Sequence, residues 1–190
     1  MGPLSEEEKE GLIPDYLTDR STVYQLEQVN IENTLTWLRS KKLTSDVILS
    51  VDFIQSLHKR MFGDVWHWAG KYRLTDKNLG VSYPFIPMKT KALVDDARYW
   101  HENNVYPPEE LAIRFKHRLV SIHCFPNGNG RHSRLMADII MEKIYGLSYF
   151  PWGNSNLVAN DEIRKRYIEA LKKADAGETH DLIIFAKWSE

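Results

Sequence analysis

The sequence predicts an all-α fold that is interrupted by one short β-hairpin. Apolar residues recur at helical spacing through most of the 190 residues, and prolines and glycines stand at the boundaries between these stretches. One segment, residues 66–88, differs because it places Gly70, Gly80, Pro84 and Pro87 among aromatic and β-branched residues. That segment is too punctuated for a helix, so we expect a loop with a hairpin around Asp76–Gly80.

Two helices are expected before this segment. The first covers Val23–Lys41, and Leu26, Val29, Asn33 and Trp37 fall near one face of it. The second runs from about Val51 to Phe62. Its apolar residues at helical spacing are Phe53, Ile54, Leu57 and Met61.

Further helices are expected after the segment. One covers Thr90–Asn103, and the next opens at Pro107 and Pro108, because proline suits a first helical turn, and ends near Cys124. Another starts at Asn129 or Gly130 and stops at Gly146. The last two cover about Asp161–Ala174 and His180–Trp188. A chain of this length is expected to form one compact domain.

Composition narrows the classes of function. The net charge of −1 argues against a dedicated nucleic-acid binder, which usually carries a strong basic excess. The single cysteine, Cys124, cannot form an intramolecular disulfide and is expected to be a buried, inert residue. The N-terminus has no apolar signal region, and no apolar run is long enough for a bilayer. We therefore expect a cytoplasmic location and no membrane partner.

The most informative stretch is His123-Cys-Phe-Pro-Asn-Gly-Asn-Gly-Arg-His-Ser-Arg134. Gly128 and Gly130 let the backbone approach a ligand where a helix begins, and free N–H groups there favour an anion. Two arginines three residues apart, Arg131 and Arg134, suit a di- or triphosphate. Asn129 adds an amide donor. His123, across the turn, could take a proton from an incoming hydroxyl.

Each of these elements also has a structural interpretation. A Gly-Asn-Gly sequence at a helix start is often only a bend, and a single histidine is usually structural. The two arginines could instead pair with acids such as Asp138. The stretch is no Walker A loop, because no lysine followed by Ser or Thr comes after its glycines. Each element serves a different need of one reaction, and this favours a site. His132 is expected to be exposed.

The stretch resembles the signature of Fic-domain proteins, His-x-Phe-x-(Asp/Glu)-Gly-Asn-Gly-Arg-x-x-Arg. Seven of its eight specified positions match, namely His123, Phe125, Gly128, Asn129, Gly130, Arg131 and Arg134. Trp68–Arg73 is similar to the family's segment that leads into a flap hairpin. The helix after the core is similar as well, through Arg166, Ala170 and Leu171. The whole chain also resembles the small Fic proteins labelled mobile mystery protein B.

The resemblance implies a Fic-type helical bundle with a β-hairpin flap, in which residues 45–190 form the catalytic core and residues 1–44 a helical extension. It implies transfer of AMP from ATP to a Ser, Thr or Tyr hydroxyl of a target protein, with His123 as general base. Phosphates would be bound by Asn127, Gly128, Asn129, Gly130, Arg131 and Arg134. The flap would pair with the target's backbone through Lys77, Asn78, Leu79, Gly80 and Val81. An antitoxin chain or a second copy of the protein would be a further partner.

Asn127 departs from the family pattern, which has Asp or Glu there to hold Mg²⁺ (or Mn²⁺) against the phosphates. An asparagine offers one neutral carbonyl oxygen, and magnesium prefers charged oxygen ligands. We expect a weakened but real transferase. Transfer of another group, such as UMP or a terminal phosphate, and a nucleotide-binding regulatory or toxin–antitoxin protein without turnover stay open.

The extension contains a candidate inhibitory residue. Many relatives carry a (Ser/Thr)-x-x-x-Glu-(Gly/Asn) motif whose glutamate pairs with the second motif arginine. Gln28-Val-Asn-Ile-Glu32-Asn33 matches the end of that motif, so the resemblance implies that Glu32 reaches Arg134. The alternative is that Glu32 is a solvated carboxylate on a helix face.

Overall fold

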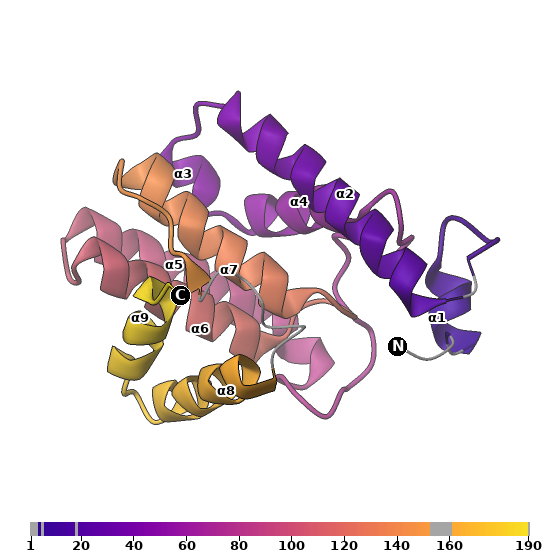
Figure 1. The fold of residues 1–190 in the computed structure, drawn as a ribbon. Coiled ribbons are helices and arrows are strands. Elements are labelled where there is room, and N and C mark those ends of the chain that lie inside the picture. Colours follow the sequence, from indigo (N-terminus) through magenta and orange to yellow (C-terminus); the bar gives the residue numbers. More distant parts are fainter. Residues whose placement is uncertain (1–3, 5, 18, 153–160, 190) are drawn as a thin grey trace.

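The structure is a computed structural model that describes residues 4, 6–17, 19–152 and 161–189. These residues form helices and connecting loops (Figure 1), and Leu12 and Trp66 form an isolated β-bridge. The prediction of an all-α fold is therefore confirmed for this part of the chain. The elements are α1 (Glu6–Gly11), α2 (Arg20–Arg39), α3 (Ser45–Ile48), α4 (Val51–Phe62), a 3₁₀ turn η1 (Tyr83–Phe85), α5 (Ile86–Glu102), α6 (Pro108–Ile122), α7 (Asn129–Ile139), a π-helical turn η2 (Ile140–Ile144), α8 (Asp161–Asp175) and α9 (His180–Lys187).

Helices α6 and α7 occupy the middle of the molecule. Helix α6 packs against α5, α7 and α9, while α4 packs between α2 and α7. In Figure 1, α2 runs along one edge and α8 and α9 lie along the opposite side. The central helices bury large apolar side chains such as Phe62, Phe115 and Phe125, whose exposure is 0%. The loop between α6 and α7 is thus held on a closely packed base.

Helix boundaries agree with the sequence where proline or glycine marks them. Helix α6 begins at Pro108, and Gly146 follows the last helical turn with φ of 65°, as expected for a C-terminal glycine. Helix α5 begins at Ile86, earlier than predicted, because Pro87 stands in its first turn rather than in a loop. The short α3 was not predicted.

The buried face of α2 differs from the prediction. Val29 is 53% exposed, and the helix instead buries a stripe of Val23, Glu27, Asn30, Thr34 and Leu38. The middle of this stripe is polar, and it is buried because it has hydrogen-bond partners. Asn30 accepts from the amide of Asp64, and Glu27 binds side chains near the central loop.

The predicted hairpin around Asp76–Gly80 is absent, and this part of the prediction was wrong. The loop of residues 74–81 (the 74–81 loop) is held by side chains instead of a strand ladder. Arg73, 2% exposed, donates to the carbonyls of Thr75, Val81 and His123, and the Val81 amide bonds to Ile122. With these backbone groups satisfied, little is left for cross-strand pairing.

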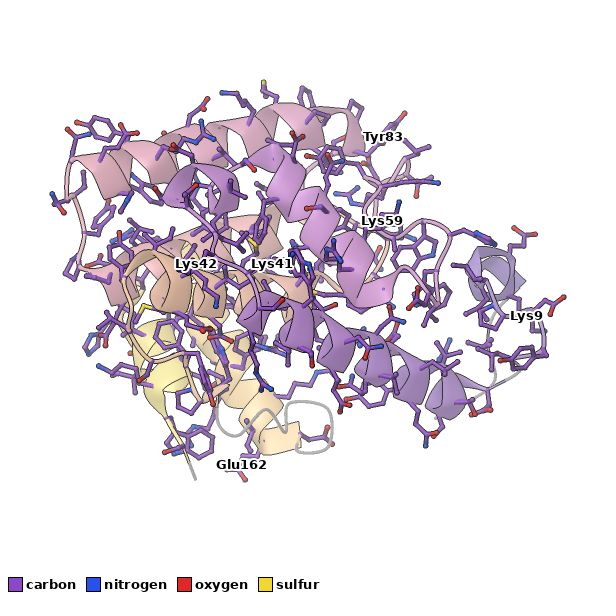
Figure 2. The ribbon with its side chains drawn as sticks, turned by 90° about the horizontal axis from the view of Figure 1, so that it is seen from above. Lys9, Lys41, Lys42, Lys59, Tyr83 and Glu162 are labelled. Atoms are coloured by element: carbon purple, nitrogen blue, oxygen red, sulfur yellow. The ribbon has the colours of Figure 1, made fainter. Side chains whose placement is uncertain are left out.

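Asp76 fixes the far end of the same segment. Its carboxylate accepts hydrogen bonds from the amide of Tyr83 at 2.7 Å and the hydroxyl of Ser82 at 3.2 Å. Tyr83 is at the surface beside the start of α5 (Figure 2). No helix in the described part of the chain is long and apolar enough to cross a membrane.

Candidate active site

The loop between α6 and α7 is built from two left-handed turns. His123 ends α6 with φ of 57°, and Gly128 precedes α7 with φ of 78°. A Cβ atom at Gly128 would lie 2.6 Å from the Phe62 ring, so only glycine fits there. The Asn129 side chain closes the loop, since its Oδ1 accepts from the Phe125 amide and its Nδ2 donates to the Phe125 carbonyl. The main role of Asn129 is therefore to hold the loop conformation, whereas the sequence predicted a free amide donor for the ligand.

Two buried histidines, His58 and His132, pack against this loop on the side of the hydrophobic core. His58 accepts from the Gly70 amide at Nδ1, so its Nε2 carries the proton and donates to the Asn127 carbonyl at 3.0 Å. His132 donates from Nε2 to the Ile54 carbonyl at 2.9 Å and is 1% exposed. The prediction that His132 is exposed was wrong. Burial lowers the pKa of His132 to about 3 and that of His58 well below its usual value, so both rings are neutral.

Helix α7 presents its N-terminus to a pocket of about 830 Å³. The first amide bonded within the helix is that of His132, so the N–H groups of residues 129–131 precede the hydrogen-bonded turn. A Cβ at Gly130 would meet no atom within 4 Å. The backbone at this helix start is thus accessible to a ligand.

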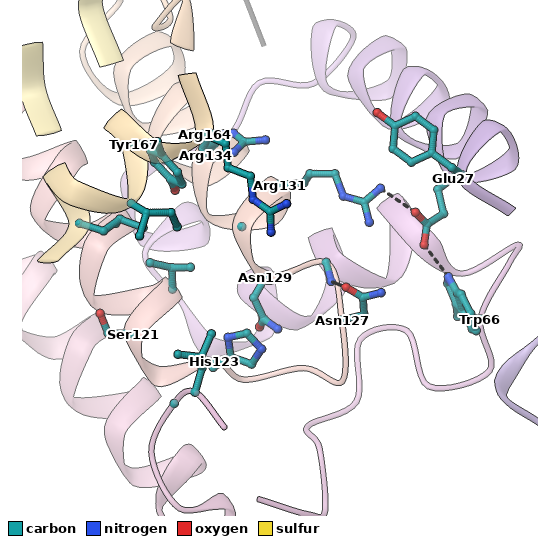
Figure 3. Close-up of a pocket in the computed structure, with 18 of the residues that line it drawn as sticks. Glu27, Trp66, Ser121, His123, Asn127, Asn129, Arg131, Arg134, Arg164 and Tyr167 are labelled. Carbon is teal, nitrogen blue, oxygen red and sulfur yellow. Dashed lines mark hydrogen bonds and ion pairs between the residues drawn. The ribbon is translucent and has the colours of Figure 1, made fainter. Parts of the chain in front are cut away.

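The predicted site residues meet in this one pocket, whose lining includes His123, Asn127, Gly128, Asn129, Gly130, Arg131, Arg134, Leu79 and Gly80. Lys77, Asn78 and Val81 belong to the same 74–81 loop but do not line the pocket. Figure 3 shows His123 and Asn129 at the base of the pocket, with Arg131 and Arg134 above them. The cationic side chains and the helix N-terminus both favour an anion at this place.

His123 is held in place from both sides. Its carbonyl accepts from Nε of Arg73 at 2.7 Å, and Gly80 packs so closely that a Cβ there would lie 2.6 Å from the His123 Cβ. Burial, followed by the charges of Arg73 and Lys77, lowers the pKa of His123 below its usual value. The imidazole is therefore neutral near pH 7 and able to accept a proton.

Glu27 was missed by the sequence reasoning and is the acidic group that the structure places at the motif. It is 4% exposed on α2, and its carboxylate accepts from Arg131 Nη1 at 2.6 Å and from Trp66 Nε1 at 2.7 Å (Figure 3). Glu32 is exposed, and its backbone carbonyl accepts from Thr36. Glu32 therefore matches the alternative, an exposed carboxylate on a helix face, and does not reach Arg134. Apolar periodicity gave no signal for Glu27, because its neighbours in the buried stripe, Asn30 and Thr34, are polar as well.

Asn127 offers little to a metal ion. Its Oδ1 already accepts from the Gly128 amide at 2.7 Å, and it carries no charge. Among the described residues no group of three or more His, Cys, Asp or Glu side chains could hold a metal. The residues present thus do not fit a resident magnesium site, since magnesium is usually bound through one or two carboxylates.

The remaining candidates have structural partners. Asp138 does not neutralise Arg134 by an ion pair. Its carboxylate accepts from the Trp152 indole and the Phe150 amide, and burial raises its pKa to about 7. Cys124 is buried as expected, and burial raises its pKa to about 11, so it is an inert thiol.

Comparison with known proteins agrees with this geometry. Residues 48–141 match the model of the Fic/DOC family. The chain is 24% identical over 170 residues to "Protein adenylyltransferase Fic" of Nematostella vectensis, covering 87% of this chain and 38% of that protein. It is 30% identical over 147 residues to "Protein adenylyltransferase fic-1" of Caenorhabditis briggsae, covering 75% of this chain and 27% of the relative. The chain thus spans well under half the length of these curated relatives.

Solved structures show the same fold. Fic-1 (residues 134–508) of C. elegans superposes with a TM-score of 0.70 at 24% identity, over 97% of this chain and 54% of that one. BepC of Bartonella tribocorum, crystallised with bound AMPPNP, gives a TM-score of 0.65 at 15% identity, over 90% of this chain and 87% of that one. With the matched family model, the signature turn and the shared fold, the chain carries a domain of the Fic/DOC family.

Proposed function

We propose that this protein transfers AMP from ATP to a Ser, Thr or Tyr hydroxyl of a target protein. The observation that carries the proposal is that His123, the α7 N-terminus, Arg131 and Arg134 all line one pocket. The names of the relatives, which are protein adenylyltransferases, support the same activity. The crystal structure of BepC with bound AMPPNP supports a nucleotide as the ligand.

The residues have separate roles in this reaction. The amides at the start of α7 and the guanidinium groups of Arg131 and Arg134 bind the phosphates and offset the charge on the departing pyrophosphate. The target hydroxyl attacks the α-phosphorus, the bond to the β-phosphate oxygen breaks, and the hydroxyl proton passes to neutral His123. The target's backbone lies along the exposed 74–81 loop, which passes beside His123 at Gly80.

In this proposal, helix α2 inhibits the transfer through Glu27. Glu27 lies in the extension of residues 1–44 and holds Arg131 by a charge-assisted hydrogen bond in a buried position. A nucleotide phosphate must compete with this carboxylate for the same guanidinium. Arg131 therefore cannot bind the phosphate until its contact with Glu27 opens. The inhibitory role that was expected for Glu32 is thus assigned to Glu27.

A second candidate is nucleotide binding without turnover, as in a regulatory or toxin–antitoxin protein. The observation that favours it is the state of Asn127, which is neutral and already bonded to the Gly128 amide. Mg²⁺ or Mn²⁺ would then gain little from the protein. We favour transfer, because His123 remains neutral and lines the pocket with the arginines.

One experiment separates these candidates. The full chain carrying Glu27→Gln, in which Arg131 is released, is incubated with cell lysate and ATP labelled either at the α- or at the γ-phosphate, and label in precipitated protein is counted. Transfer of AMP predicts label from the α-position that is lost with His123→Ala, and no difference between the two chains in label from the γ-position, which lysate kinases also supply. Label from the γ-position that is lost with His123→Ala would indicate transfer of a terminal phosphate. Tight ATP binding without incorporation of either label would favour the regulatory candidate.

A further inference from the structure

Lys116 is a buried lysine for which the proposed reaction has no role so far. It lies on α6, is 0% exposed, and its Nζ donates a hydrogen bond to the hydroxyl of Tyr167 on α8. The ammonium also lies 4.5 Å from the centroid of the Tyr167 ring. Within the described residues, no carboxylate forms an ion pair with Lys116. Burial of this charge is costly and lowers the pKa of Lys116, while the contact with Tyr167 acts in the opposite direction and favours the ammonium form.

Tyr167 connects this lysine to the pocket. Tyr167 lines the same pocket as His123, and the guanidinium carbon of Arg134 lies 5.9 Å from the centroid of the Tyr167 ring. Figure 3 shows Tyr167 at the end of the pocket away from Glu27, next to Arg134. Burial alone would raise the pKa of Tyr167, but the charges of Lys116 and Arg134 lower this pKa below its usual value. The phenol thus lies between two cations.

The hydroxyl proton of Tyr167 has no acceptor in Lys116 or Arg134. An ammonium and a guanidinium can only donate, so the Tyr167 oxygen is the acceptor toward both Lys116 and Arg134. The phenol's own O–H cannot bond to either of them and needs an acceptor elsewhere. A phosphate oxygen bound by Arg134 would supply that acceptor, and its negative charge would offset the buried ammonium.

We propose that Tyr167 is a phosphate-binding residue of this pocket and that Lys116 positions it. The Tyr167 hydroxyl donates to an outer phosphate of a polyphosphate held by Arg134. Lys116 acts through Tyr167, orienting its oxygen and strengthening it as a donor. The inference rests on the proposed function only for the identity of the ligand as a nucleoside triphosphate.

The test measures direct binding of ATP and AMP by calorimetry, with no transfer required. All variants are made in the full chain carrying Glu27→Gln, so that Arg131 is free for phosphate. Tyr167→Phe keeps the ring, and Lys116→Met keeps the length of the side chain without its charge. We expect Tyr167→Phe to weaken ATP binding about tenfold, the worth of one hydrogen bond to a charged group. Lys116→Met should also weaken ATP binding. In both variants the change in AMP binding should be smaller than the change in ATP binding.

A control tyrosine and a stability measurement exclude a purely structural effect. Tyr145→Phe removes a hydroxyl that contacts His101 outside the pocket and should leave ATP binding unchanged. The melting temperature of Lys116→Met should not be lower than that of the parent, because the substitution removes a buried charge that has no ion-pair partner. Equal affinity for ATP in Tyr167→Phe and the parent would overturn the proposal, and so would equal losses for ATP and AMP. ATP binding that depends on Tyr167 but is not followed by transfer would refute the proposed function alone.

Discussion

The contact between Glu27 and Arg131 gives the sharpest prediction about activity. Glu27→Gln keeps the size of the side chain and an oxygen that can accept from the Trp66 indole, but it removes the charge that holds Arg131. The Glu27 side chain is 6% exposed and that of Arg131 is 21% exposed, so the pair is largely shielded from water. Arg131 is released into the pocket that it lines.

The size of the effect follows from this one contact. A hydrogen bond to a charged group contributes about 1.5–3 kcal/mol, and about 1.4 kcal/mol corresponds to a factor of ten in affinity. We therefore expect Glu27→Gln to bind ATP about ten- to a hundredfold more tightly than the parent. The fold should lose about 2 kcal/mol of unfolding free energy, less than the about 3–5 kcal/mol usual for breaking a buried pair, because Arg131 can turn toward solvent.

The assay is calorimetric titration with ATP, accompanied by urea unfolding of each variant. Glu32→Gln is the matched control, because Glu32 lies on the same helix but is exposed, and it should change neither quantity. Unchanged ATP affinity in Glu27→Gln would refute the idea that this carboxylate competes with phosphate. A gain in Glu32→Gln that equals the gain in Glu27→Gln would refute the assignment to Glu27.

Three further predictions concern the base, the metal and the stability. Transfer by the Glu27→Gln chain should rise with pH to a plateau, with a midpoint below the usual histidine pKa of 6.5, because burial lowers the pKa of His123. A rate that still rises above pH 8 would contradict a neutral His123. Asn127→Asp should raise the Mg²⁺-dependent rate of AMP transfer, by adding the missing charge, with no gain in a metal-free control reaction. His132 has a folded-state pKa of about 3 against 6.5 unfolded, so protonation favours the unfolded chain. Stability from His132 is present above pH 6.5 and falls by about 1 kcal/mol between pH 6.5 and pH 5.5. In urea titrations His132→Gln should lose this slope, and an unchanged slope would argue against a buried neutral ring.

Asp138 opposes the histidines in that titration. Its folded-state pKa of about 7 lies above its usual value of 3.8, so its protonated form favours the folded chain. Its contribution therefore rises as pH falls from about 7 toward 4, while that of His132 falls. The difference between the parent and His132→Gln is the quantity that isolates the histidine.

Much of the site could be predicted because it is local in sequence. The turn from His123 to Gly128, the start of α7 and the two arginines lie within twelve residues, and backbone geometry brings them together. Helix α4 could be predicted to its end residues because its apolar face is regular. These features depend on short-range rules of spacing and turn chemistry.

The errors came from polar side chains whose partners are distant in sequence. Glu27 is buried because Arg131, more than a hundred residues away, neutralises it, and periodicity of apolar residues cannot reveal such a pair. His132 is buried because the Ile54 carbonyl accepts its proton. The 74–81 loop forms no hairpin because Arg73 takes the backbone carbonyls. Each correction follows from a buried polar group that found its partner.

The most direct test of AMP transfer by His123 is the intact mass of the full chain after incubation with ATP and Mg²⁺. The Glu27→Gln chain should gain the mass of one or more AMP groups on its own hydroxyl side chains. The Glu27→Gln, His123→Ala chain should gain none while still binding ATP. An AMP adduct of equal yield in both chains would contradict the role of His123, and no adduct in either chain despite tight ATP binding would contradict the transfer itself.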